Sequence, residues 1–458
     1  MKTPICDFVS RYAEAKTVRM HMPGHKGLSR LGPEAMDITE ISGADSLYEA
    51  SGIIAESERR TATLFGTKMT LYSTEGSSQC IRGMLALVQL HMAKMQTNSY
   101  VLAARNLHKT FVTAAGLLDI EVRFLVPDNE ATTLYAPVSL PALEEIFKKE
   151  PPAALYVTSP DYLGNIAPIE TISALCHRYG VLLLVDNAHG AYLRFLSPSR
   201  HPINLGADLC CDSAHKTLPA LTGAAYLHLA EGLPSYFYET ARDAMAMFGS
   251  TSPSYLILQS LDLLTESLKD EFPAKLAAFA DAASAFKMRL EAHGFCLMGD
   301  EPLKLTVLPK AFGYTATALA AHLRKNNIEC EFSDEDSLVL MLSPYMETDV
   351  LTHTADVLCS LPRKKPIQKA APKPHVPARF CSVREAMLAP NECVPLSEAK
   401  GRVLSSLSVS CPPAVPPVIC GETVDESVLE ILSYYGITEC RVMIERKEIH
   451  YDLVTEKK

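Results

Sequence analysis

The chain has 458 residues, a hydrophobic fraction of 48% and a net charge of −10, which is typical of a folded protein with about two to four domains. Its acidic balance argues against a nucleic-acid surface, and its 13 cysteines include no CxxC pair, which argues against zinc and a disulfide framework. Apolar runs are far shorter than the ~20 residues that span a bilayer, and the N-terminus lacks the apolar core of a signal peptide. We therefore expect a cytoplasmic protein without a membrane partner.

After an N-terminal arm over 1–55, strand-like and helical patterns alternate through 56–262, which we interpret as a large domain. The run Val-Leu-Leu-Leu-Val at 181–185 is typical of a strand buried on both faces of a parallel sheet. Other short apolar runs lie between segments of helical spacing, of which 81–95 is the longest. This βαβ rhythm predicts an α/β domain built on an open, mainly parallel sheet. The other predicted strands are 100–103, 154–157 and 209–211, and a second helix is predicted at 169–179.

The pattern changes after residue 262. An Ala-rich helix at 275–292 precedes strand-like runs at 303–308 and 338–342, which predicts a small α+β domain over 263–361. Residues 362–378, PRKKPIQKAAPKPHVPA, show neither the helical nor the strand period of apolar residues and are interpreted as an extended linker. Its basic residues indicate either a solvated tether, which we favour, or a phosphate or membrane patch. Residues 379–458 then form a C-terminal α+β domain.

Polar residues follow four of the predicted strands. Ligands of such sheets bind at the carboxyl ends of the strands, so four polar clusters at one edge predict a functional site. Each residue alone also has an ordinary structural explanation, such as a helix cap or a solvated loop. The clusters are Arg105, Asn106 and His108; Ser159, Asp161 and Tyr162; Asp186 and His189; and Asp212, Ser213, His215 and Lys216.

A fifth element predicts an anion site. Glycine and two serines, Gly76, Ser77 and Ser78, precede the helix predicted at 81–95. Backbone N–H groups and hydroxyls at a helix N-terminus suit a phosphate, although a plain N-cap would use the same residue types.

Together these groups match the needs of pyridoxal 5′-phosphate. Its aldehyde needs a lysine amine, for which Lys216 is the candidate. Its ring nitrogen keeps a proton beside an anion, which Asp186 would supply at the end of a buried strand. The imidazole of His108 can stack on the ring, while Ser213 and His215 share the turn of Lys216 and can reach the phosphate.

At these residues the sequence resembles the Orn/Lys/Arg decarboxylase family, whose members are fold-type-I pyridoxal-phosphate enzymes. The resemblance covers nearly the whole chain and corresponds to the short form of the family. Its motifs are HMPGHKG at 21–27, RNLHKT at 105–110, TSPDYLG at 158–164, DNAHGAYLRF at 186–195, GADLCCDSAHKTLPALTG at 206–223 and STSPSY at 250–255. RFCSVREA at 379–386, VPLSEAKGRV at 394–403 and CPPAVPP at 411–417 resemble the family's C-terminal domain.

The resemblance implies decarboxylation of lysine, arginine or ornithine to carbon dioxide and a polyamine-type amine. It implies that Lys216 binds the cofactor aldehyde, Asp186 pairs with the ring nitrogen, His108 stacks on the ring and His189 lies beside it. It also implies a homodimer or larger homo-oligomer with active sites at the interface, without a metal or a nucleic acid. The implied phosphate ligands are Gly76, Ser77, Ser78, Ser213, His215 and, reaching a partner's phosphate, Thr251 or Ser252.

Three positions depart from the family pattern: Asp161 replaces Thr, Glu75 replaces Asn and Ala414 replaces Gly. Asp161 and Glu75 leave open an aminotransferase or aldolase-like lyase on the same scaffold. A cofactor-binding regulatory protein without turnover is a separate alternative. Glu329 and Glu331 alternate on a predicted strand and are candidates to neutralise a cationic side chain, although a solvated strand face is the favoured explanation.

Overall fold

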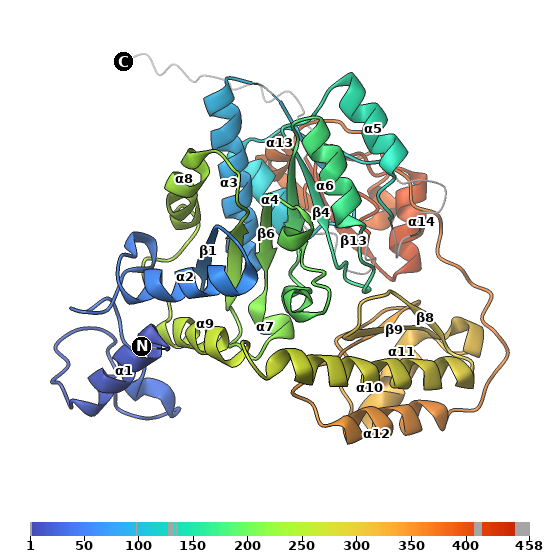
Figure 1. Cartoon of the computed structure of the whole chain (residues 1–458). Coiled ribbons are helices and arrows are strands. Elements are labelled where there is room, and N and C mark those ends of the chain that lie inside the picture. Colours follow the sequence, from blue (N-terminus) through green and yellow to red (C-terminus); the bar gives the residue numbers. More distant parts are fainter. Residues whose placement is uncertain (1, 98, 127–131, 133–135, 407–414, 445–458) are drawn as a thin grey trace, which may run out of the picture.

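The computed structural model describes residues 2–97, 99–126, 132, 136–406 and 415–444 (Figure 1). Its centre is a seven-stranded sheet of order β1-β7-β6-β5-β4-β2-β3. The strands from β3 to β6 in that order run parallel, and β7 runs antiparallel to both β6 and β1. The predicted α/β class with a mainly parallel sheet is confirmed. The strands are β1 Met69–Ser73, β2 Val101–Ala103, β3 Val122–Phe124, β4 Ala154–Thr158, β5 Leu182–Asp186, β6 Leu209–Asp212 and β7 Ala225–Leu229.

Helices cover both faces of this sheet (Figure 1). Successive residues of β5 point to opposite faces: Leu184 joins the core under α3, α4 and α8, whereas Leu183 and Val185 join the core under α5 and α6. The unbroken apolar run therefore fits a strand covered on both sides. These helices are α3 Ser77–Met95, α4 Lys109–Leu118, α5 Leu140–Lys149, α6 Ile169–Arg178 and α8 Ser235–Ala246.

The N-terminal arm is tied to the large domain through a helix cap. Helix α1 (Pro4–Glu14) begins over α9 (Tyr255–Ser267), and the carboxylate of Asp262 on α9 accepts hydrogen bonds from the backbone N–H groups of Ile5 and Cys6. An anion at a helix N-terminus satisfies otherwise unpaired donors and complements the helix dipole. Helix α2 (Ile53–Phe65) then packs against both α1 and α9.

A second, four-stranded antiparallel sheet of order β10-β11-β9-β8 follows helix α10. The strands expected at 303–308 and 338–342 are present as β9 and β11. The strand predicted to carry Glu329 and Glu331 does not form over these residues, because β10 contains only Phe332–Ser333. Glu329 instead pairs with Arg324 at 2.9 Å on the surface. The elements are α10 Phe272–His293, β8 Cys296–Met298, β9 Lys304–Leu308, α11 Ala316–Lys325, β11 Leu338–Met341 and α12 Thr348–Cys359.

Residues 362–378 contain no helix or strand. Their first part is not a free tether, because Lys364 and Ile367 donate backbone N–H bonds to the carbonyls of Phe312 and Lys310. Beyond it, helix α13 packs on α4, and Arg384 donates to the last carbonyls of α4, at Gly116 and nearby. The elements of this region are α13 Val383–Leu388, β12 Asn391–Pro395, α14 Glu426–Tyr434 and β13 Glu439–Met443, with β12 and β13 paired.

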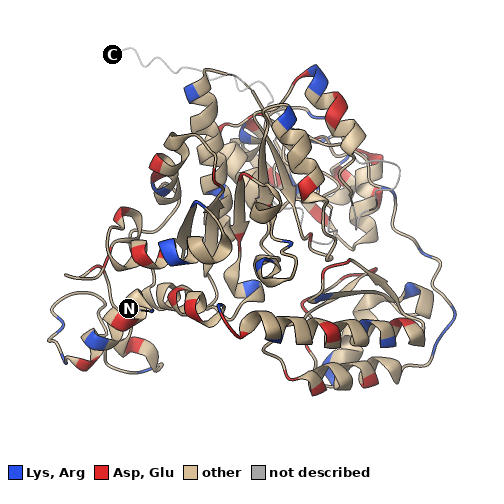
Figure 2. Cartoon of the chain, viewed as in Figure 1, with Lys and Arg blue, Asp and Glu red and all other residues tan. Residues whose placement is uncertain are grey.

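Acidic and basic residues are intermixed over the outer helices (Figure 2). Among the described residues, no helix combines the length and the apolar character required to cross a membrane.

Candidate active site

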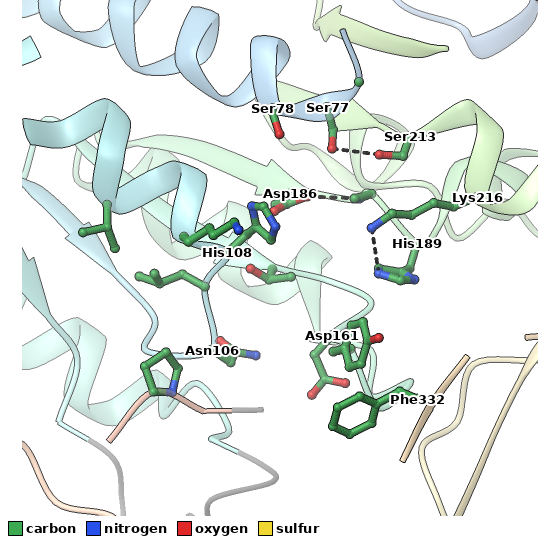
Figure 3. Close-up of a pocket in the computed structure, with 18 of the residues that line it drawn as sticks. Ser77, Ser78, Asn106, His108, Asp161, Asp186, His189, Ser213, Lys216 and Phe332 are labelled. Carbon is green, nitrogen blue, oxygen red and sulfur yellow. Dashed lines mark hydrogen bonds between the residues drawn. The ribbon is translucent and has the colours of Figure 1, made fainter. Parts of the chain in front are cut away.

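A cavity of about 610 Å³ lies at the carboxyl ends of the parallel strands. It is lined by loops of the large domain, by Phe332 of the small domain and by residues of the C-terminal region, including Ile419. Figure 3 shows Ser77 and Ser78 at one end and Asn106, Asp161 and Phe332 toward the other. Three parts of the chain that are far apart in sequence thus enclose one site.

The first end of the cavity has the properties of a phosphate site. Gly76 adopts a φ of 72°, which favours glycine, and precedes the 19-residue helix α3. Ser77 and Ser78 begin this helix, and the hydroxyl of Ser213 donates to the hydroxyl of Ser77 at 2.7 Å. His215 donates from Nδ1 to the carbonyl of Ala224 at 2.8 Å. In the neutral ring the proton is therefore on Nδ1, and Nε2 carries none. Helix N–H groups, hydroxyls and an imidazole therefore meet where an anion can bind.

Asp186 ends β5 as a buried carboxylate with 2% of its surface exposed. Its Oδ2 accepts from the hydroxyl of Tyr156 at 3.0 Å and its Oδ1 from the backbone N–H of Ala188 at 3.1 Å. Burial raises the pKa of Tyr156 well above its usual value, so the phenol remains a donor. A buried carboxylate is costly without a cation, and a protonated ring nitrogen in the cavity would supply one.

Lys216 lies in the short helix α7 (Ala214–Thr217), with Nζ 3.1 Å from Nε2 of His189. Burial, followed by the nearby charges of Lys304 and Lys216, holds the pKa of His189 well below its usual value. The imidazole is therefore neutral and Nε2 accepts from the lysine. The ring of Tyr162 meets His189 edge-on, with centroids 5.5 Å apart.

His108 caps the N-terminus of α4, where its Nδ1 accepts from the backbone N–H of Thr110 at 3.3 Å. Desolvation lowers the pKa of His108, which favours a neutral ring. Figure 3 places this imidazole beside Asp186 within the cavity.

Polar atoms without hydrogen-bond partners in the cavity are consistent with the binding of pyridoxal phosphate. Among the described residues, three buried polar atoms of cavity residues have no hydrogen-bond partner: Asn106 Oδ1, Thr158 Oγ1 and His189 Nδ1. Buried polar groups are rarely left unpaired, so these atoms indicate a polar ligand. The phosphate end, the carboxylate of Asp186 and the amine of Lys216 complete the set of groups that this cofactor needs.

Asp161 and Glu75 line the cavity but bind backbone groups of nearby loops, whereas Thr251 lies outside it. The carboxylate of Asp161 accepts from the backbone N–H groups of Leu163 and Asn165 at 3.0 and 2.9 Å, so it shapes its own loop although it lines the cavity. Glu75 accepts from the backbone N–H of Ser250 and thereby ties the phosphate loop to the segment that contains Thr251. Thr251 itself is exposed and does not line the cavity of its own chain, so its role toward a partner stays a prediction.

Three residues that follow the predicted strands are buried away from the cavity: Arg105, Ser159 and Asp212. Asp212 accepts hydrogen bonds from Nε2 of both His201 and His228, at 3.0 and 3.2 Å. These two hydrogen bonds explain how the carboxylate of Asp212 is satisfied although it is buried. Sequence reasoning missed Tyr156, because it lies inside a strand, and Phe332, because it comes from the second sheet.

Comparison with known proteins agrees with this geometry. A family described as "Orn/Lys/Arg decarboxylase, major domain" matches residues 3–296. An arginine decarboxylase of Bacillus subtilis is 28% identical over 94% of this chain and 93% of its own length, and one of Halalkalibacterium halodurans is 28% identical over 93% and 92%. The lysine decarboxylase of Francisella novicida superposes with a TM-score of 0.77 at 16% identity, covering 96% of this chain and 81% of that one. The constitutive lysine decarboxylase of Escherichia coli gives 0.75 at 18%, covering 96% and 82%.

Proposed function

Starting from the finding that this chain belongs to the Orn/Lys/Arg decarboxylase family, we propose that arginine is the amino acid it decarboxylates. The chain is a pyridoxal-phosphate-dependent decarboxylase of a basic amino acid. Arginine is favoured because the relatives matched over most of both chains include four that carry the name arginine decarboxylase. The observation that carries the mechanism is the meeting of Lys216, Asp186 and the phosphate end in one cavity.

Bound pyridoxal phosphate supplies an electron sink for the electron pair of the bond between Cα and the carboxylate. Asp186 holds the proton of the ring nitrogen, and Tyr156 and Ala188 hold the carboxylate of Asp186 in place. His108, which lines the cavity, would lie against one face of the ring. These residues make the sink effective because a buried anion favours the protonated ring.

Lys216 has two roles in this proposal. Its Nζ would hold the cofactor aldehyde, and as a free amine the same group would deliver a proton to Cα of the substrate. Neutral His189 accepts from Nζ at 3.1 Å and so holds the amine beside the reacting carbon. Tyr162 and Phe332, whose centroids are 5.3 Å apart, exclude water from this side of the cavity.

Recognition of the distal charge is assigned to Glu331. The hydroxyl of Tyr162 lies 3.5 Å from its Oε1, so this exposed carboxylate stands at the rim beside a residue of the cavity. Glu329, in contrast, is paired with Arg324. A carboxylate at the rim suits a cation at the end of a long side chain.

The protein is also proposed to be a cytoplasmic homodimer. Large apolar side chains of the N-terminal arm are exposed, with Met20 at 90% and Leu31 at 92%, as expected for a segment that a second copy covers. All cysteines among the described residues are free thiols, which fits a reducing compartment.

Incubation of the holoenzyme with arginine, lysine, ornithine and a neutral amino acid, with carbon dioxide and amine measured, tests the function. Release of carbon dioxide and agmatine from arginine without a keto acid supports the proposal. Amine-group transfer that needs a keto acid would instead indicate an aminotransferase, and aldehyde formation would indicate an aldolase-like lyase.

A further inference from the structure

The side chain of Arg105 does not serve the cofactor cavity, although it follows β2 and begins the motif RNLHKT. It is 1% exposed, and its guanidinium forms a bidentate pair with Glu422 of the C-terminal region, at 2.8 Å from Nη1 and 2.6 Å from Nη2. Nε and Nη2 also donate to the carbonyls of Pro416 and Pro417, at 3.0 and 3.2 Å. One buried cation thus holds a segment more than three hundred positions away in sequence.

The segment that Arg105 holds is a wall of the cavity. Pro416, Val418, Ile419 and Cys420 line it, and the last three are between 1% and 3% exposed. Glu422 fixes this segment a second time, because its Oε2 accepts from the backbone N–H of Ile419 at 2.7 Å. We name residues 416–420 the C-terminal wall. It is apolar toward the cavity, and its backbone is bonded to the Arg105–Glu422 pair.

The position of the C-terminal wall indicates what it contacts. Asn106, the neighbour of Arg105, lines the cavity at the end opposite Ser77 and Ser78 (Figure 3). Because Arg105 adjoins Asn106 in the chain and is bonded to the wall, we infer that the wall bounds the Asn106 end of the cavity, which remains for an amino acid. A buried ion pair of this kind is a poor source of stability but a good device for fixing one geometry.

We propose that Arg105 is a positioning residue that acts through Glu422 to hold the C-terminal wall against the aliphatic part of the substrate side chain. The C-terminal domain thereby determines which basic amino acid is accepted. This inference rests on the proposed function, because it names the element that selects among its substrates. One methylene more or less against an apolar wall changes kcat/KM by about 10–200-fold, which is enough to separate ornithine, lysine and arginine.

The test compares Arg105→Lys with Arg384→Lys, because both residues join the C-terminal region to the large domain by donating to carbonyl groups but only Arg105 contacts the wall. Each holoenzyme is assayed for kcat and KM with arginine, lysine and ornithine, together with the visible absorbance of bound cofactor. We expect Arg105→Lys to keep the absorbance, raise KM about tenfold with a smaller effect on kcat, and reduce the ratio of kcat/KM between the best and second-best substrates about tenfold. Arg384→Lys should keep the wild-type ratio.

An unchanged KM and ratio in Arg105→Lys would overturn the inference, as would a parallel loss of absorbance and kcat, which would place Arg105 in the cofactor site. If Arg105→Lys fails to fold, Ile419→Ala decides, since it shortens one side chain of the wall and leaves the ion pair intact. An unchanged substrate ratio in that variant overturns the inference. Failure of the proposed function itself is distinct: the wild-type protein would then release no carbon dioxide from any of the three amino acids.

Discussion

Nζ of Lys216 lies 3.1 Å from Nε2 of His189, and both side chains line the cavity together with the carboxylate of Asp186 that ends β5 (Figure 3). Burial keeps His189 neutral, so it accepts a hydrogen bond from the lysine without competing for positive charge. The amine is thereby held by one neutral acceptor and remains able to form a bond to an aldehyde. Its neighbours Ser213 and His215 face the phosphate end from the same turn.

Replacement of Lys216 by Ala should abolish the visible absorbance of the bound cofactor, because Lys216 supplies the amine that lies in the cavity against His189. We expect kcat to fall by about 10²–10⁴-fold, the range for loss of a general acid or base. Lys109→Ala is the matched control, since Lys109 also lines the cavity but is exposed, and it should retain the absorbance. Absorbance spectra and decarboxylation assays of both variants check this, and a retained band in Lys216→Ala would assign the covalent bond to another residue.

Asp186→Asn should reduce kcat by at least about 10²-fold while the protein stays folded, because the amide keeps the shape but cannot hold a proton on the ring nitrogen. The control is Asp161→Asn, since the amide oxygen still accepts from the backbone N–H groups of Leu163 and Asn165. We expect that variant to stay within a few-fold of wild type. Steady-state assays and thermal melts of both proteins measure the contrast. Equal activities of Asp186→Asn and Asp161→Asn would show that Asp186 has no special role in the mechanism.

The gathering of polar strand ends at one edge was predictable because it follows from the parallel sheet alone. Asp186 ends β5 and Lys216 follows β6, and these parallel neighbours bring their carboxyl ends together. The antiparallel strand β7 was not predictable from that rhythm, since a βαβ pattern carries no information about a hairpin return. The alternation of Glu329 and Glu331 wrongly predicted a strand at these two residues. The pairing with β11 begins at Phe332, and before it only the backbone N–H of Glu331 bonds to β11, at the carbonyl of Val339.

The walls of the site were beyond sequence reasoning for a physical reason. Phe332 belongs to the second sheet and Ile419 to the C-terminal region, and both reach the cavity through contacts between distant parts of the chain. No local period encodes a contact between residues 311 positions apart, such as that of Arg105 with Pro416. Arg105 was correctly predicted to follow a strand, but its side chain points away from the cavity because it pairs with Glu422. The role of Thr251 needs a second chain and stays a prediction.

Lys304 should make stability depend on pH in the alkaline range. Burial lowers its pKa from 10.5 to about 8, although Glu301 and Asp161 oppose this. Between these two values the unfolded chain binds a proton that the folded chain lacks, so stability rises with pH by up to about 1.4 kcal/mol per unit. Lys304→Met should lose this rise. Urea unfolding at pH 7.5, 8.5 and 9.5 gives the difference between wild type and variant. A difference that is constant across this range would contradict the shift.

Glu331→Gln should weaken recognition of the substrate's distal charge. An exposed carboxylate contributes on the order of 1 kcal/mol to an ion pair, so KM for arginine should rise about fivefold with kcat little changed. Glu329→Gln is the matched control, because the carboxylate of Glu329 is paired with Arg324 whereas that of Glu331 contacts the cavity residue Tyr162, and KM should stay at the wild-type value. Higher salt should raise KM for wild type and less for Glu331→Gln, since screening acts only where the charge pair exists. Steady-state kinetics at two ionic strengths checks both expectations. Equal KM values for the two glutamine variants would contradict the assignment of cation recognition to Glu331. Equal salt dependence of KM in wild type and Glu331→Gln would also contradict it, and this comparison does not depend on any effect of the substitution on folding.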